Sequence, residues 1–426
     1  MTVLDPKTFL TSIFNAAVAA ADPERTIRDH LPAKPKGRTI VIGAGKGSAQ
    51  MAAAFEKAWD GPIEGLVVTR YGYGATCERI EIIEAAHPVP DAAGLEASRR
   101  LLAKVRGLTA DDLVVALISG GGSALLPSPA GSLTLADEIA VNEALLASGA
   151  PIAAMNTIRK HLSTIKGGRL AAAAYPAKVV SLVVSDIPGD NPALVASGPT
   201  VPDTGSREDA LASISAYGMK LPAAVMAHIN SSAADAPSPD DKRFSRNEVH
   251  LIASAGVSLE AAAVEAKRQG VEAVILSDAI EGEAREVGGV HAAIAREVAT
   301  RNRPFSKPVL ILSGGETTVT LRAPINGIRG KGGRNSEFLL AFAIGVNGVD
   351  GIHALAADTD GIDGSENNAG AFADGSTVSR MRAAGVDAKA MLAGNNAWTA
   401  FNAVGDLFVP GPTGTNVNDL RAILIR

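Results

Sequence analysis

Two glycine-rich segments, each following a short apolar run, are the first parts of the sequence that could bind an anion. Residues 43–48 read Gly-Ala-Gly-Lys-Gly-Ser, and residues 119–123 read Ser-Gly-Gly-Gly-Ser. Glycine lets backbone N–H groups approach phosphate or carboxylate oxygens, and a helix that starts after such a turn adds the positive end of its dipole. Lys46 lies inside the first segment, where its ammonium could reach a phosphoryl group during transfer. We therefore expect both segments to bind anionic groups.

Neither segment matches a common nucleotide or hydrolase motif. Ser48 stands where the third glycine of a dinucleotide-binding turn would be, and the segment is too short for a Walker loop. Ser123 lacks the glycine two residues downstream that a nucleophile elbow requires, because Leu125 occupies that position. A tight structural turn is the alternative for both segments, with Lys46 solvated in the first.

A basic segment follows at residues 156–169 and carries Asn156, Arg159 and Lys160. Such a cluster in an acidic protein favours a surface that faces an anion. A solvated basic helix face is the alternative.

Two carboxylates follow the apolar run at residues 178–184. Asp186 and Asp190 come directly after it. Carboxylates at the end of a strand can hold Mg²⁺ or accept a proton from a substrate hydroxyl. Asp and Pro are also ordinary turn residues, so a plain turn is the alternative.

The second half of the chain has its own basic loop. Residues 327–337 contain Lys331 and Arg334 directly before an apolar, helix-like run. Cations at the start of a helix oppose its dipole unless an anion compensates them, so this loop is also expected to meet an anion. Asp358 opens a later acidic stretch that resembles part of an EF-hand but lacks the downstream glutamate, which favours a turn or a Mg²⁺-linked site.

Strand-like and helix-like segments alternate around these loops, which indicates an α/β fold. A polar, proline-containing stretch at residues 231–247 interrupts the alternation and reads as a linker. We expect two domains with mostly parallel sheets, at residues 1–245 and 246–404. Residues 405–426 end in a further strand, and the sequence leaves open whether it rejoins the first domain.

The composition excludes several classes of protein. Apolar residues make up 46% and charged residues 20% of 426, enough for a large core without disulfides, and Cys77 is the single cysteine. A net charge of −5 and only 4% aromatic residues argue against a nucleic-acid binder. No stretch approaches the roughly 20 apolar residues that span a bilayer. We expect a cytoplasmic enzyme with small-molecule substrates and no nucleic-acid or membrane partner.

Taken together and in this order, the loops resemble the glycerate 2-kinase family with its MOFRL-type C-terminal domain. The segments that carry the resemblance are 43–48, 119–125, 156–168, 185–203, 313–317, 330–337, 358–364 and 414–419. The resemblance implies transfer of the γ-phosphoryl group of ATP to the C2 hydroxyl of D-glycerate, by a monomer or homodimer. It also implies two Rossmann-like domains with the active site in the cleft between them. The chain departs from many relatives at Ala253-Ser254-Ala255, where they carry asparagine.

With this resemblance and the needs of phosphoryl transfer, we assign roles to the candidate residues. Lys46 and Arg334 match the family's essential basic residues, and Asp190 would orient the C2 hydroxyl. Mg²⁺ is expected with ATP, with Asp186 and Asp358 as its carboxylate ligands. The residues expected to bind substrate or phosphate are Gly45, Ser119, Gly120, Gly121, Gly122, Ser123, Asn156, Arg159, Lys160, Lys331, Gly332, Gly333 and Asn416.

Two other functions remain open. A hydroxypyruvate reductase would use residues 43–47 to bind NAD(P)H. The second strand ends at Arg70 without the acid that binds the ribose of NAD, although Arg70 could meet the 2′-phosphate of NADPH. A non-catalytic sugar-phosphate sensor would use the same anion-binding loops.

Overall fold

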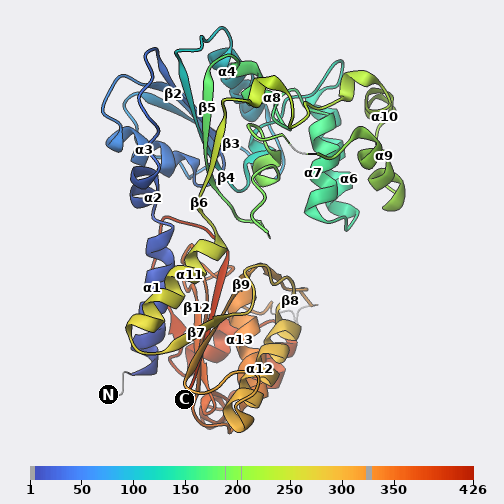
Figure 1. Ribbon diagram of the computed structural model, residues 1–426. Coiled ribbons are helices and arrows are strands. Elements are labelled where there is room, and N and C mark those ends of the chain that lie inside the picture. The colour runs from blue at the N-terminus through green and yellow to red at the C-terminus, as the bar shows by residue number, and fades with distance from the viewer. Residues whose placement is uncertain (1–4, 188, 203, 323–328) are drawn as a thin grey trace. The chain divides into compact units, whose positions relative to one another are not determined.

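The computed structural model describes residues 5–187, 189–202, 204–322 and 329–426. The chain forms two compact units (Figure 1). The N-terminal unit is Pro23–Ile252, and the C-terminal unit combines Met1–Asp22 with Ala253–Arg426. No helix of the described residues is long and apolar enough to cross a membrane.

A six-stranded sheet forms the centre of the N-terminal unit, in the order β3-β2-β1-β4-β5-β6. Its strands are β1 (Thr39–Ala44), β2 (Glu64–Arg70), β3 (Ile80–Ala85), β4 (Leu113–Ser119), β5 (Lys178–Val184) and β6 (Glu248–Ala253). The pairings from β3 through β5 are all parallel. The chain runs outward from β1 to β3 and then returns to place β4 on the other side of β1. In such sheets, ligands bind beyond the carboxyl ends of the two strands where the winding reverses, here β1 and β4.

Helices cover both faces of this sheet, which is why β1 and β4 are apolar and buried along their whole length. The helices are α2 (Pro23–Asp29), α3 (Ser48–Ala58), α4 (Ala92–Val105), α5 (Gly122–Leu125), α6 (Leu135–Ala147), α7 (Ile152–His161), α8 (Arg169–Ala174), α9 (Arg207–Ala216) and α10 (Ala223–Ile229). Short 3₁₀ helices lie at Val195–Ser197, Ser232–Ala234 and Lys242–Phe244. Helices α6, α7, α9 and α10 project to one side of the sheet (Figure 1) and share an apolar core of their own that includes Leu145, Ile158, Ile214 and Ile229.

The sheet of the C-terminal unit has the order β13-β12-β11-β14-β9-β7. Its strands are β7 (Glu272–Ile275), β9 (Val309–Gly315), β11 (Ile352–Asp358), β12 (Gly370–Asp374), β13 (Leu407–Phe408) and β14 (Asp419–Ile425). Only β7 and β9 pair in parallel among these described strands, and the other pairings are antiparallel. The expectation of a mostly parallel sheet is therefore wrong for this unit. A short apolar run buried on both faces has the same pattern in either direction, so the sequence did not reveal it.

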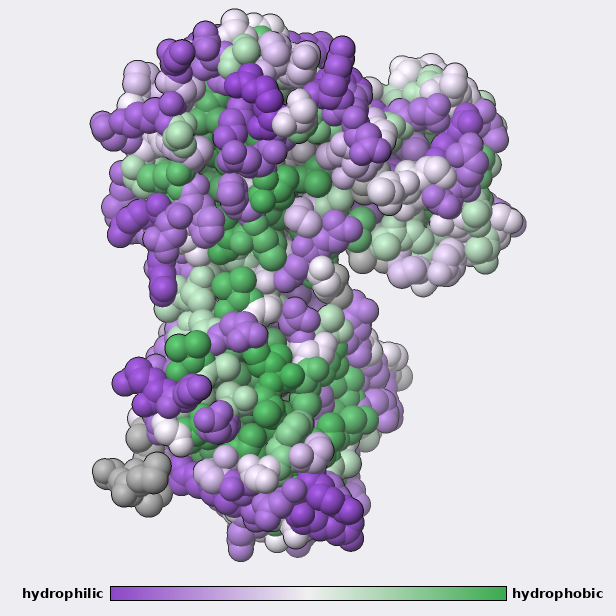
Figure 2. Space-filling view, in the orientation of Figure 1, coloured by the Kyte–Doolittle hydropathy of each residue, from purple (hydrophilic) through white to green (hydrophobic). Residues whose placement is uncertain are grey.

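The remaining elements surround this second sheet. The helices are α1 (Pro6–Ala20), α11 (Ala255–Arg268), α12 (Ala284–Arg301), α13 (Arg334–Val346), α14 (Thr377–Ala383), α15 (Ala388–Ala393) and α16 (Ala397–Ala403). Two short strands, β8 (Gly282–Glu283) and β10 (Thr317–Thr318), pair in parallel beside it. Polar residues cover much of the visible face, while apolar residues gather over the C-terminal unit around α11 (Figure 2).

Both ends of the chain lie in the C-terminal unit, which differs from the expected division of the sequence. Strand β14 is inserted between β11 and β9, so it does not complete the first sheet. Helix α1 packs through Phe9 and Phe14 into a cluster with Leu259 of α11 and Leu420 of β14. Strand β6, expected to begin the second domain, extends the first sheet. An apolar stripe predicts burial, but it does not specify which sheet will cover it.

Candidate functional site

The two glycine turns of the N-terminal unit lie against each other at the carboxyl ends of β1 and β4. The backbone N–H of Lys46 donates to the carbonyl oxygen of Gly120 at 2.9 Å. The hydroxyl of Ser119 accepts a hydrogen bond from the N–H of Gly47 at 2.9 Å and lies 3.1 Å from the hydroxyl of Ser48. The turns therefore form one preassembled structure where the winding of the sheet reverses.

Two positions in these turns require glycine, because neighbouring atoms leave no space for a Cβ. Gly45 has φ +143, and a Cβ there would collide with the Ser119 hydroxyl. Gly121 has φ +75, and a Cβ there would lie 2.9 Å from the Cγ and Cε atoms of Lys46 and 3.2 Å from Nε2 of His87. The Lys46 side chain thus lies across Gly121. No described residue forms a hydrogen bond or ion pair with its ammonium.

The structure places one of the two predicted carboxylates beside these turns. The carboxylate of Asp186 lies directly against Gly120, where a Cβ would overlap it. Asp190 lies farther along the same loop with φ 51, and its N–H donates to the carbonyl oxygen of Ile187 at 3.3 Å. Among the described residues, Asp190 forms no hydrogen bond or ion pair with either glycine turn. The geometry therefore brings Asp186 to the site.

His87 is a site residue that the sequence reasoning missed. It follows β3 by two residues, at the same edge of the sheet as Lys46, and is half-buried. Burial, with the nearby charges of Lys46 and Arg70, lowers the pKa of His87 to about 4, so its imidazole is neutral at physiological pH. The available signal was a histidine shortly after the apolar residues that form β3.

Helix α7 contributes a hydrogen-bonded network next to the turn that follows β4. The amide oxygen of Asn156 accepts from the hydroxyl of Ser197 at 2.8 Å, and that hydroxyl lies 2.7 Å from the hydroxyl of Ser123. Arg159 donates to Asn156 at 3.3 Å and to Asn142 at 2.7 Å. Asn156, Ser123 and Arg159 are thereby held in place by the protein itself.

The lysines of this segment are buried. Lys160 and Lys166 each have about 1% of their surface exposed. The ammonium of Lys166 pairs with Glu138 at 2.7 Å and donates to the carbonyl oxygen of Leu126 at 2.8 Å. The alternative of a solvated basic face is therefore wrong.

In the C-terminal unit, Arg334 is bound by three carboxylates. Its guanidinium donates to Asp419 at 2.7 Å, to Asp358 at 2.7 Å and to Glu316 at 2.9 Å. Burial alone would lower the pKa of Arg334, but the charges of Asp419, Asp358 and Glu316 raise it. The side chain remains 24% exposed, so it is not sealed from ligands.

The protein also supplies the anion expected at the start of α13. The carboxylate of Asp363 accepts from the N–H groups of Asn335 at 2.9 Å and Ser336 at 2.8 Å. Burial raises the pKa of Asp363 to about 6, against the effect of these donors. Internal carboxylates therefore already compensate both the helix terminus and Arg334, so the charge of this loop does not by itself require an external anion.

Asp419 joins these groups into one buried network. Its carboxylate also accepts from the side-chain amide of Asn335 at 2.7 Å and from Arg421 at 2.8 Å. Arg421 is fully buried and donates to the carbonyl oxygen of Gly314 at 3.1 Å. Burial raises the pKa of Asp358, and the charge of Arg334 opposes the rise.

The other predicted residues of this unit shape the same loops. The ammonium of Lys331 lies 5.1 Å from the centre of the Trp398 ring. Gly332 has φ +147, and a Cβ on Gly333 would collide with Asp363. The side-chain oxygen of Asn416 accepts from the N–H of Asn418 at 3.1 Å, which closes the turn before β14.

The carboxylates fit a magnesium ion in only one of the two predicted places. Asp358 is already bound by Arg334 and by the N–H of Asp360, so it does not fit. No group of three or more His, Cys, Asp or Glu side chains in the described ranges is arranged to hold a metal. Asp186 supplies one carboxylate beside the glycine turns, and Mg²⁺ at phosphate sites is commonly held by one or two carboxylates together with the phosphates.

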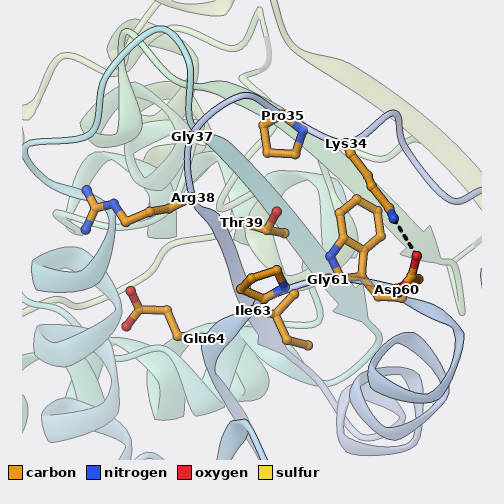
Figure 3. Close-up of a pocket in the computed structure, with 11 residues that line it drawn as sticks. Lys34, Pro35, Gly37, Arg38, Thr39, Asp60, Gly61, Ile63 and Glu64 are labelled. Atoms are coloured by element: carbon orange, nitrogen blue, oxygen red, sulfur yellow. Dashed lines mark hydrogen bonds and ion pairs between the residues drawn. The ribbon is translucent and has the colours of Figure 1, made fainter.

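A cavity of about 410 Å³ lies at the opposite end of the N-terminal sheet (Figure 3). Thr39 and Glu64, the first residues of β1 and β2, line it together with Trp59 and the ion pair between Lys34 and Asp60. Catalytic sites of parallel sheets lie beyond the carboxyl ends of the strands, so we place the candidate site at Lys46 despite the size of this cavity.

Comparisons with known proteins identify relatives of the chain. Residues 9–230 match the model of a domain of unknown function, DUF4147, and residues 309–419 match the MOFRL family. The chain is 40% identical to D-glycerate 2-kinase of Thermotoga maritima over 98% of both chains. It is 53% identical to an Agrobacterium vitis protein named "Putative hydroxypyruvate reductase", over 98% of this chain and 94% of that one. The crystal structure of Thermotoga maritima glycerate kinase superposes with a TM-score of 0.89 and 39% identity, covering 99% of both chains. The chain therefore belongs to the DUF4147/MOFRL glycerate kinase family.

Proposed function

We propose that the protein transfers the γ-phosphoryl group of ATP to the C2 hydroxyl of D-glycerate, forming 2-phospho-D-glycerate and ADP. The observation that carries the proposal is the pair of interlocked glycine turns, with the Lys46 side chain lying across Gly121. Phosphoryl transfer needs mainly positioning and compensation of negative charge, and this arrangement offers backbone donors and a cation without an internal partner among the described residues.

Each group at the edge of the N-terminal sheet has a distinct role in the proposed reaction. The ammonium of Lys46 binds the transferring phosphoryl group or the carboxylate of glycerate. Backbone N–H groups of the turn that follows β4 bind further anionic oxygens, while Ser119 holds the two turns together. Asp186 would hold Mg²⁺, which neutralises charge on the phosphates when bound. Asp190 is proposed to orient the C2 hydroxyl from the same loop as Asp186.

Arg334 is proposed to serve the same reaction from the C-terminal unit. Its described hydrogen bonds engage Nε and both terminal nitrogens, which leaves two of its five N–H groups for phosphoryl oxygens. Because Asp419, Asp358 and Glu316 fix the orientation of the guanidinium, its donors are preorganised.

ADP release from ATP is the direct test of this proposal. Purified protein is assayed with ATP, Mg²⁺ and a panel of hydroxy acids that contains D-glycerate, L-glycerate, glycolate and lactate. We expect ADP release to depend on D-glycerate and to be slow or absent with the others. Equal ADP release with and without any hydroxy acid would contradict the proposal.

Reduction of hydroxypyruvate is a second candidate, favoured by the name of the Agrobacterium vitis relative. The end of β2 argues against it. Thr69 is buried, and the guanidinium of Arg70 stacks on the ring of Tyr73 at 3.7 Å, so the last residues of β2 itself do not supply the acid that binds the ribose of NADH. Oxidation of NADH or NADPH by hydroxypyruvate would support the reductase, and a lack of oxidation with both would exclude it.

A further inference from the structure

Within the described chain, neither ring nitrogen of His87 forms a hydrogen bond with another residue. Three other histidines form such bonds. The rings of His30 and His161 bond backbone carbonyl oxygens, and His291 bonds a carbonyl oxygen and the hydroxyl of Ser313. A half-buried imidazole whose polar atoms lack protein partners is available to a ligand.

The backbone around His87 is anchored on both sides. The N–H of Tyr71 donates to the carbonyl oxygen of Ala85 at 3.1 Å, and the hydroxyl of Tyr71 donates at 2.8 Å to the carboxylate of Asp91, which also caps α4. On the other side, the side-chain amide of Asn142 donates to the carbonyl oxygen of Pro88 at 3.3 Å. These bonds tie the turn to β2, α4 and α6, so the imidazole is presented from a fixed backbone.

The imidazole lies at the place where the proposed chemistry occurs. Its Nε2 atom and the side chain of Lys46 approach the same face of Gly121, and only the missing Cβ of that glycine leaves room for both. The charges of Lys46 and Arg70 act on the ring as well. The edge of the sheet therefore offers cations for anionic oxygens and, beside them, one neutral group that can accept a hydrogen bond.

From this geometry we infer that His87 is a catalytic residue that accepts the hydrogen bond of the acceptor hydroxyl and orients its oxygen toward the phosphoryl group. The inference rests on the proposed function. A neutral acceptor suits this task, because an imidazolium beside Lys46 could only donate and would leave the hydroxyl proton unbound.

The step balances without a further reactant. A lone pair of the C2 oxygen forms the new bond to the γ-phosphorus. The bond from phosphorus to the β,γ-bridging oxygen breaks, and its electron pair leaves with ADP. The hydroxyl proton passes to the imidazole as the new bond forms, and from there to solvent. In a loose transition state the proton is released late, so a weak base is sufficient.

Kinetics of His87→Ala and His87→Gln test the inference. We expect His87→Ala to lower kcat by about 10²-fold, with the KM for ATP changed less than threefold. His87→Gln keeps an acceptor near the position of Nε2 and should retain more activity, and free imidazole should restore part of the kcat of His87→Ala. His250→Gln is the control, because His250 is 42% exposed and pairs with Glu248 on β6. Thermal unfolding of each variant separates misfolding from lost chemistry.

A ligand that lacks the C2 hydroxyl makes the test independent of turnover. 3-Hydroxypropionate keeps the carboxylate and the terminal hydroxyl of glycerate. We expect His87→Ala to weaken D-glycerate binding in calorimetry about threefold or more and to leave 3-hydroxypropionate binding unchanged. Equal effects on both ligands, or a folded His87→Ala with the kcat of the unaltered protein, would overturn the inference. The proposed function would stand in that case, since it fails only if the unaltered protein releases no ADP with D-glycerate.

Discussion

Lys46 is the residue on which the proposed chemistry depends most. Its side chain lies across Gly121, and none of the described side chains pairs with its ammonium, so its removal disturbs little of the fold. The sequence predicted a cation in this turn because a glycine pattern is local. It did not predict His87 beside Lys46. That proximity depends on the turn after β3, which lies three strands from β4 in the order of the sheet.

We expect Lys46→Ala to lower kcat by about 10²-fold or more, because a directed charge contact with the transferring group is lost. Its Tm should stay within a few degrees of that of the unaltered protein. Steady-state kinetics and calorimetry measure the two quantities. Lys57→Ala is the matched control, since Lys57 is 67% exposed and forms a surface pair with Glu24. An unchanged kcat in Lys46→Ala would show that Lys46 is not part of the site.

We expect a different result for Arg334, because three carboxylates bind its side chain. Lysine keeps the charge but cannot donate in three directions, so Arg334→Lys should lower both kcat and stability. We expect kcat to fall about tenfold or more and the free energy of unfolding to fall by about 1–3 kcal/mol, less than the roughly 3–5 kcal/mol for removing one partner of a buried ion pair, because lysine keeps the charge. Urea unfolding and steady-state kinetics measure both.

Arg301→Lys serves as the control for Arg334→Lys, because Arg301 is exposed and pairs with Glu297 at 3.2 Å. If Arg334→Lys lost stability but kept its kcat, Arg334 would be structural only.

At the scale of elements, the turn between β4 and α5 must leave space at Gly121. Gly121→Ala would force a left-handed residue and push a methyl group against Lys46 and His87. Gly107→Ala is a matched control, since Gly107 has φ +72 and nothing lies within 4 Å of its added Cβ. Both variants should lose about 1 kcal/mol of stability through the backbone, and only Gly121→Ala should lose most activity. Equal activities would show that the space above Gly121 is unimportant.

The buried carboxylate of Asp363 at the start of α13 should make the stability of the protein depend on pH. The pKa of Asp363 is about 6 in the folded protein, compared with an ordinary value of 3.8 for an aspartate side chain. Between these pH values the folded protein binds more protons than the unfolded chain, so the contribution of Asp363 to stability is largest below pH 4 and falls as the pH rises through 6. The full change is of the order of 3 kcal/mol.

Asp363→Asn tests this contribution, because asparagine does not titrate. The difference in unfolding free energy between the unaltered protein and Asp363→Asn should shift in favour of the unaltered protein as the pH falls from 7.5 to 5. Urea titrations at both pH values measure it. A difference that stays constant or moves the other way would contradict the raised pKa.

At the scale of the whole molecule, the sequence predicted an α/β protein with glycine turns after its strands. Those features are local, since apolar runs and glycines mark strands and turns wherever they lie. The placement of β14 between β11 and β9, and of α1 on α11, was not predictable, because it depends on which apolar surfaces meet. The ion pair of Arg334 was unpredictable for the same reason, because its partner Asp419 lies 85 residues away in the chain.

The central claim is that this chain phosphorylates the C2 hydroxyl of D-glycerate, and the position of the new phosphate tests it most directly. Phosphorus NMR with proton coupling, recorded on the product of ATP, Mg²⁺ and D-glycerate, distinguishes phosphate on C2 from phosphate on C3. We predict a phosphorus signal split by the single C2 proton, which grows about 10²-fold or more slowly in a parallel reaction with Lys46→Ala. A signal split by the two C3 protons, or inorganic phosphate alone, would contradict the account.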